Sequence, residues 1–163
     1  REALLLGAGG AARAIAFALH DAGFALHILN RDSMRARRLL EELGIATSHH
    51  PDAHFQLAGD PVLRARSHPP GSAFHLIVNA TTLGMTGKPP LSFRLDADPE
   101  AVVYDIVYDP LETALLAAAR ANGNRTLDGL RMLVGQAASA FARFFGQPAP
   151  RAEDAALRAL LLA

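Results

Sequence analysis

The sequence predicts an α/β fold, with a doubly wound, mainly parallel sheet and helices on both of its faces. Two observations support this fold class. The run Ala3-Leu4-Leu5-Leu6 is wholly apolar, as is typical of a parallel strand that helices cover on both faces. A strand, a glycine turn, a helix, a second strand and a second helix then follow one another within the first 44 residues. This order predicts parallel strands joined by right-handed crossovers.

The first half of the chain is expected to hold two strands and two helices, in the order 3–6, 10–22, 25–29 and 33–43. Gly23 and Gly44 end the two helices, and Asp32 or Ser33 can cap the start of the second. The spaced alanines of the first helix are expected to lie on one of its faces; they are Ala14, Ala18 and Ala22. Residues 45–72 are rich in proline and histidine, and we expect only a short strand and a short helix there, at 45–47 and 61–66.

The second half continues the alternation of strands and helices. Strands are expected at 74–78, 101–105 and 125–127, and helices at 111–122, 128–145 and 153–162. Asp128 is the expected N-cap of the long helix, and Gly146 its end. We interpret residues 1–146 as one domain and residues 147–163 as a C-terminal helix packed on it.

The composition narrows the class of function. The 163 residues suit a single domain, and half of them are hydrophobic, which excludes wholesale disorder. A formal net charge of zero argues against nucleic acid or an acidic membrane as the main partner. The absence of cysteine excludes disulfides and metal–thiolate sites, and it fits a cytoplasmic location. No apolar run approaches the roughly 20 residues that span a bilayer.

A glycine-rich turn follows the first strand and carries the clearest chemical signal. The segment 7–12 reads Gly-Ala-Gly-Gly-Ala-Ala and fits the pattern G-x-G-x-x-A between a strand and a helix. Gly7 allows the tight turn, Gly9 lets the backbone approach a pyrophosphate, and Ala12 lets the helix pack on the strand. The helix N-terminus offers free N–H groups to the anion. The segment therefore predicts a dinucleotide site, with a plain tight turn as the alternative.

The end of the second strand favours NADP over NAD. Asn30 stands where NAD enzymes usually carry the acid that binds the adenosine ribose. Arg31 follows at once and Arg35 lies one helical turn on, and guanidinium groups match the oxygens of a 2′-phosphate. Asp32 leaves two alternatives, because it could repel this phosphate or cap the helix and orient the arginines.

Polar loops follow the other strands, and they share one expected edge of the sheet. Ligands of open α/β sheets bind at the carboxyl ends of the strands, so we expect these loops to line the cleft for cofactor and substrate. The loops are residues 79–85, 104–110 and 128–133.

These motifs, in this order, resemble those of the shikimate dehydrogenase family. The resemblance rests on residues 7–12, 30–31, 79–81, 104–113 and 128–137, and it covers most of residues 3–146. It implies a Rossmann-like fold and the C-terminal, nucleotide-binding half of an NADP-dependent oxidoreductase. That enzyme would reversibly reduce 3-dehydroshikimate to shikimate in the biosynthesis of chorismate and aromatic amino acids. The family's N-terminal substrate domain would then precede Arg1, and the resemblance leaves a homodimer as a possible assembly.

The resemblance also implies roles for individual residues. The pyrophosphate would lie against Gly7, Ala8, Gly9, Gly10 and Ala11. The adenosine ribose and its phosphate would be held by Asn30, Arg31 and Arg35, with Asp32 standing where the family often has threonine. The rest of the cofactor would pass along Asn79, Ala80 and Thr81, with its nicotinamide at Ile106 and Gly129. Tyr108 and Gln136 would reach the substrate, and Arg131 stands where many relatives have glycine.

No catalytic residue is assigned within this chain. In the family, a lysine and an aspartate of the N-terminal half act on the substrate hydroxyl. Lys88 is the only lysine here, and it lies outside every matching motif. Asp105, Tyr108 and His75 are candidate bases, but proton transfer is assigned to none of them. We expect the chain alone to bind cofactor without turning over shikimate.

Three alternatives stay open. Four histidines and Asp52 between residues 49 and 68 could hold a metal, although their irregular spacing favours a solvated loop and we assign no metal. A dinucleotide-binding module without chemistry is a second alternative, and it would have no need for Tyr108 and Gln136 to face a substrate. An NAD-dependent quinate/shikimate dehydrogenase is the third.

Overall fold

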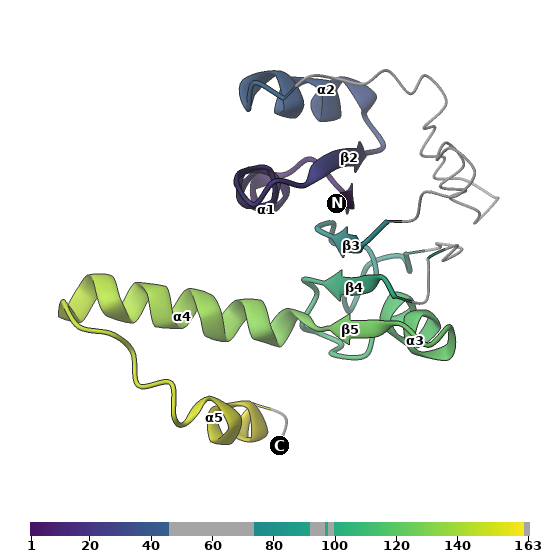
Figure 1. Cartoon of the computed structure of the whole chain (residues 1–163). Coiled ribbons are helices and arrows are strands. Elements are labelled where there is room, and N and C mark those ends of the chain that lie inside the picture. The colour runs from purple at the N-terminus through teal and green to yellow at the C-terminus, as the bar shows by residue number, and fades with distance from the viewer. Residues whose placement is uncertain (46–73, 92–96, 98–99, 162–163) are drawn as a thin grey trace.

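Five parallel strands form one sheet in the order β2-β1-β3-β4-β5 (Figure 1). The strands are β1 (Glu2–Leu6), β2 (Ala25–Leu29), β3 (Leu76–Asn79), β4 (Val102–Asp105) and β5 (Arg125–Leu127). The computed structural model describes residues 1–45, 74–91, 97 and 100–161. From β1 the chain winds outward to β2, and from β3 it winds outward to β4 and β5. The winding therefore changes direction between β1 and β3, which is where ligands bind in folds of this kind.

Helices cover both faces of the sheet, as the sequence predicts for a doubly wound fold. The helices are α1 (Gly10–Asp21), α2 (Ser33–Glu42), α3 (Ala114–Ala121), α4 (Gly129–Phe145) and α5 (Asp154–Leu160). One core cluster joins α1 and α2 to the sheet through Ala12, Ala16 and Leu39. The other packs α3 on the opposite face through Leu115 and Leu116. The predicted Rossmann-like fold class is confirmed.

Two details of the helices come from the structure. On α1 the buried residues are Ala12 and Ala16, and the face shared by Ala14, Ala18 and Ala22 is exposed. The helix predicted over 111–122 begins only at Ala114, because Thr113 occupies the N-cap and its hydroxyl accepts from the Leu116 N–H. The short strand and helix predicted near 45–47 and 61–66 lie almost wholly outside the described residues.

The C-terminal part projects away from the sheet. In Figure 1, α4 extends far beyond the strand ends, and the chain then turns back beneath it to form α5. No residue of α5 is buried, and Phe144 near the end of α4 is largely exposed. Within the described ranges, no helix combines the length and apolar character that a bilayer crossing requires.

Candidate functional site

The carboxyl ends of the five strands bring the predicted cofactor residues to one edge of the sheet. Gly7, Asn30, Ala80, Ile106 and Asp128 directly follow β1, β2, β3, β4 and β5. Backbone hydrogen bonds continue between the neighbouring segments beyond the strands. Gly7 donates to the Leu29 carbonyl at 2.7 Å, Ala80 to Leu6 at 2.8 Å and Ile106 to Asn79 at 3.1 Å. The loops are thus fixed side by side by the sheet that carries them.

The glycine turn leaves an open space where a pyrophosphate could approach. Gly7 has a positive φ of 109°, and a Cβ there would lie only 3.0 Å from the Ala80 carbonyl oxygen, so the turn requires glycine. At Gly9 and Gly10, by contrast, a Cβ would meet nothing within 4 Å. Both residues are exposed, and Gly9 is the N-cap of α1, whose first turn carries no acidic residue.

The first N–H groups of α1 have no partner within the helix and lie beside this space. The dipole of the 12-residue helix favours an anion at the same point. The turn therefore fits the pyrophosphate of a dinucleotide by its shape and by its hydrogen-bond donors.

At the end of β2, the side chain of Asp32 caps the following helix. Its carboxylate caps α2 by accepting from the N–H groups of Met34 at 3.0 Å and Arg35 at 3.3 Å. It also pairs with the Arg35 guanidinium, at 3.5 Å between Oδ2 and Nε. Asn30 donates to the Asp32 carbonyl at 2.8 Å and so holds the turn. Asp32 therefore acts as a cap and orients Arg35.

Arg31 is exposed and has no hydrogen-bond or ion-pair partner in the described part of the chain. Its guanidinium group is therefore free to bind an anion, whereas that of Arg35 is already shared with Asp32.

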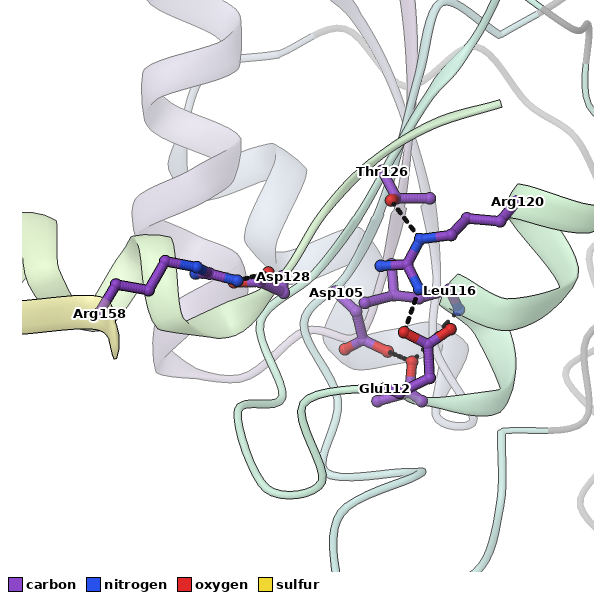
Figure 2. A network of polar contacts seen from close by, with 8 residues as sticks. Asp105, Glu112, Leu116, Arg120, Thr126, Asp128 and Arg158 are labelled. Atoms are coloured by element: carbon purple, nitrogen blue, oxygen red, sulfur yellow. Dashed lines mark hydrogen bonds and ion pairs between the residues drawn. The ribbon is translucent and has the colours of Figure 1, made fainter. Parts of the chain in front are cut away.

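A buried polar cluster lies beneath the loops after β3 and β4. Asn79, Asp105 and Thr113 are almost completely buried. The Asp105 carboxylate accepts from Asn79 Nδ2 at 2.9 Å, from the Val107 N–H at 3.0 Å and from Thr113 Oγ1 at 2.7 Å (Asp105 is labelled in Figure 2). Asn79 Oδ1 in turn accepts from the backbone N–H and the hydroxyl of Thr81. The sequence analysis missed this cluster, although the polar residues that end two buried strands were a signal for it.

The predicted nicotinamide side is built around the close approach of Gly129 to β4. A Cβ on Gly129 would lie 2.3 Å from the Ile106 carbonyl oxygen and 2.4 Å from that of Val107. The Gly129 N–H donates to the Val107 carbonyl at 3.2 Å. This contact sets the start of α4 directly against the segment that carries Tyr108.

The two predicted substrate residues lie on this side of the site and have exposed side chains. The ring of Tyr108 is 48% exposed, and Gln136 is exposed on α4, two helical turns, or about 10 Å, beyond Gly129. Burial raises the pKa of the neighbouring Tyr104, and the negative charge of Asp128 raises it further. Tyr104 therefore stays protonated at neutral pH.

An ion pair ties α5 to the start of α4. Arg158 contacts both carboxylate oxygens of Asp128, at 2.9 Å for its Nη1–Oδ1 bond (Figure 2). The hydrogen bond from Arg158 lowers the pKa of Asp128 below its ordinary value. Asp128 occupies the predicted N-cap position of α4, but its side chain makes no capping hydrogen bond.

Two of the candidate bases that the sequence suggested, Asp105 and His75, lie where a substrate in this site would not reach them. Asp105 has no exposed surface, so a substrate cannot reach it. His75 precedes β3 at the amino edge of the sheet, opposite the site, and its Nδ1 accepts from the Glu2 N–H at 3.1 Å. Lys88 is exposed in the loop after β3.

The described residues include no group of three or more metal-ligating side chains. The histidine-rich segment that suggested a metal lies outside them.

Comparisons with known proteins agree with this geometry. The family described as "Shikimate 5'-dehydrogenase C-terminal domain" matches residues 129–161. The shikimate dehydrogenase (NADP(+)) of Sphingopyxis alaskensis is 49% identical over 98% of this chain and 53% of its own length.

Solved structures of similar fold include two with bound cofactors. The shikimate 5-dehydrogenase of Thermus thermophilus, in complex with NADP(H) and shikimate, is 36% identical with a TM-score of 0.67 over 96% of this chain and 54% of its own. The quinate dehydrogenase of Corynebacterium glutamicum, in complex with NAD, is 32% identical with a TM-score of 0.72 over 94% of this chain and 52% of its own.

The chain spans about half the length of these relatives. By its sequence and by its fold, it is similar to the C-terminal part of the shikimate dehydrogenases.

Proposed function

We propose that the chain is the NADP-binding half of a shikimate dehydrogenase, which reversibly reduces 3-dehydroshikimate to shikimate in aromatic biosynthesis. The observation that carries the proposal is the open space at Gly9 and Gly10, at the N-terminus of α1 and beside the point where the winding changes direction. The relatives named as NADP-dependent shikimate dehydrogenases support the same cofactor and reaction.

The cofactor would lie along the carboxyl edge of the sheet. Backbone N–H groups of the turn Gly7, Ala8, Gly9, Gly10 and Ala11 would hold its pyrophosphate. Arg31 would bind the 2′-phosphate, with help from Asn30 and from Arg35, whose guanidinium Asp32 orients. When bound, NADPH supplies the hydride.

The remaining site residues would position the reacting ring and the substrate. Ala80 and Thr81, held by the buried Asn79, would line the cofactor on one side, and Ile106 and Gly129 would line it on the other. The half-exposed Tyr108 and the exposed Gln136 are free to make hydrogen bonds to the substrate.

Proton transfer would come from an N-terminal half that supplies a lysine and an aspartate. In the described part of this chain, Asp105 is inaccessible and His75 lies at the wrong edge of the sheet. The active protein would hold its small-molecule substrate between the two halves, in the cytoplasm, with a homodimer as one possible assembly. This chain alone would then bind the cofactor without turning over shikimate.

Calorimetric titration of the chain with NADPH tests the cofactor assignment. Gly9→Ala adds a methyl group where the protein has open space, so we expect the melting temperature to stay unchanged. The same methyl group would occupy the place of the pyrophosphate, so we expect NADPH binding to weaken about tenfold or more. Gly135→Ala, on α4 and also without neighbours within 4 Å, is the matched control and should leave binding intact. Equal binding by both variants would contradict the proposal.

An NAD-dependent quinate/shikimate dehydrogenase is the second candidate. The carboxylate of Asp32, half exposed at the end of β2, favours it, because an acid near this point can bind ribose hydroxyls. Titration with NAD and NADP separates the two candidates. NAD binding as tight as NADP binding, with no loss in Arg31→Ala, would support the second.

A further inference from the structure

Asp105 receives hydrogen bonds from three separate segments of the chain. It is the last residue of β4 and has no exposed surface. Its three donors are Asn79 at the end of β3, Val107 in the loop after β4, and Thr113 at the start of α3. Burial raises the pKa of Asp105, and these three hydrogen bonds act in the opposite direction. No other aspartate in the described residues has both this burial and this number of donors.

The carboxylate determines which way the Asn79 amide points. A carboxylate only accepts hydrogen bonds, so Asn79 must turn its NH₂ group toward Asp105 and the Leu83 carbonyl. Asn79 Oδ1 then faces the loop, where it accepts from the Thr81 N–H at 3.0 Å and from the Thr81 hydroxyl at 2.7 Å. Thr81 Oγ1 accepts from the Leu83 N–H at 3.1 Å. Asp105 therefore orders the cofactor-side loop, residues 79–83, through Asn79.

The same carboxylate orders the substrate-side segment, residues 106–113. Oδ1 accepts from the Val107 N–H, and the Val107 carbonyl accepts from the N–H of Gly129. Oδ2 accepts from Thr113, whose hydroxyl caps α3. Tyr108 lies between these two attachment points and follows Val107 directly. The backbone on both sides of Tyr108 is thus attached to Asp105.

We propose that Asp105 is a positioning residue that holds the cofactor-side loop and the substrate-side segment in a fixed relation to each other. This inference rests on the proposed function for the ligands that the two segments contact. Asp105 would not touch cofactor or substrate itself, because it is completely buried. Its contribution would be that Thr81 and Tyr108, which belong to different loops, keep one relative placement before any ligand binds.

NMR spectroscopy of the ligand-free chain can test this relation directly. The chain has two tyrosines, so ¹³C-labelled tyrosine gives few signals, and the Thr81 amide reports on the other loop. Asp105→Asn keeps the shape but turns an NH₂ group either toward Thr113 or toward both Asn79 and Val107. We expect the Thr81 and Tyr108 signals both to move and NADPH binding to weaken about tenfold, as for the loss of one charged hydrogen bond. A fall in melting temperature alone, with both signals and the affinity unchanged, would overturn the proposal.

A second pair of variants decides the question if Asp105→Asn does not fold. Thr113→Val removes the donor to Oδ2, and Thr113→Ser keeps it. We expect the valine variant to move both signals and the serine variant to restore them. A folded Thr113→Val protein with both signals unmoved would overturn the proposal. If wild-type chain does not bind NADPH, the proposed function fails, whereas the joint movement of the two signals still tests the role of Asp105.

Discussion

Gly129→Ala would place a methyl group too close to two backbone carbonyl oxygens. The new Cβ would lie 2.3 Å from the Ile106 oxygen, whereas real Cβ atoms essentially never approach a neighbour within 3.0 Å. The start of α4 and the segment after β4 must therefore separate by at least 0.7 Å (3.0 minus 2.3). The neighbouring atoms belong to the backbone, so no side chain can rotate away to relieve the contact.

The expected cost follows from this separation. Overpacking of this kind costs about 1–3 kcal/mol, and weakening the 3.2 Å hydrogen bond from Gly129 to Val107 adds about 0.5–1.5 kcal/mol. A total of about 1.5–4.5 kcal/mol lowers the melting temperature of a domain of this size by roughly 3–18 °C. Differential scanning calorimetry of the chain measures this shift.

Gly135→Ala is the control for this substitution, because it lies in the same helix but has no neighbour within 4 Å. Alanine is the better helix former, so we expect it to stabilise the chain by about 0.5–1 kcal/mol, which raises the melting temperature by roughly 1–4 °C. The two glycine-to-alanine substitutions should therefore change the melting temperature in opposite directions. A melting temperature of Gly129→Ala equal to or above that of wild type would refute the reasoning.

Three further predictions concern charged residues. Arg31→Ala should weaken NADPH binding about ten- to a hundredfold while NADH binding stays unchanged, as calorimetric titration can show, because an exposed, unpaired guanidinium binds a 2′-phosphate by charge-assisted hydrogen bonds. Asp32→Ser should keep the cap of α2 but remove the carboxylate that orients Arg35, so we expect weaker NADPH binding at an unchanged melting temperature, and tighter binding would contradict this. The Asp128–Arg158 pair stabilises the fold when Asp128 is ionised, and the folded pKa of Asp128 is lowered, so its stabilisation is present above about pH 5 and lost toward acid. The melting temperatures of wild type and Arg158→Ala should therefore differ at neutral pH and converge in acid, and a constant difference would contradict this.

The boundaries that local residues determine could be predicted from the sequence. The strand at Ala25–Leu29 and the end of α4 at Gly146 agree with the prediction. These boundaries depend on residues only a few positions away, such as the glycine that ends a helix. The positions of Gly7, Ala80 and Gly129 at one edge were also predictable, because they follow from the parallel order of the strands.

The details that depend on distant contacts could not be predicted. The start of α3 is fixed by Thr113. The hydroxyl of Thr113 also donates a hydrogen bond to Asp105, which lies at the end of β4. On α1, alanines lie on several faces, so only packing against the sheet selects Ala12 and Ala16 for burial. The Asn79–Asp105 contact spans 26 residues, and although both residues end buried strands, no local pattern identifies one as the partner of the other.

Part of the site lies outside the two core clusters, although Ala8, Ala80 and Ile106 pack against one of them, and this has a consequence for evolution. Gly9, Gly10, Arg31, Tyr108 and Gln136 belong to neither cluster, so substitutions there leave the packing of the sheet and helices intact. Selection can therefore vary the preference for cofactor and substrate almost independently of the thermal stability of the fold. The pair of solved relatives, a quinate dehydrogenase with NAD and a shikimate dehydrogenase with NADP(H), is what such a divergence on a shared scaffold would produce.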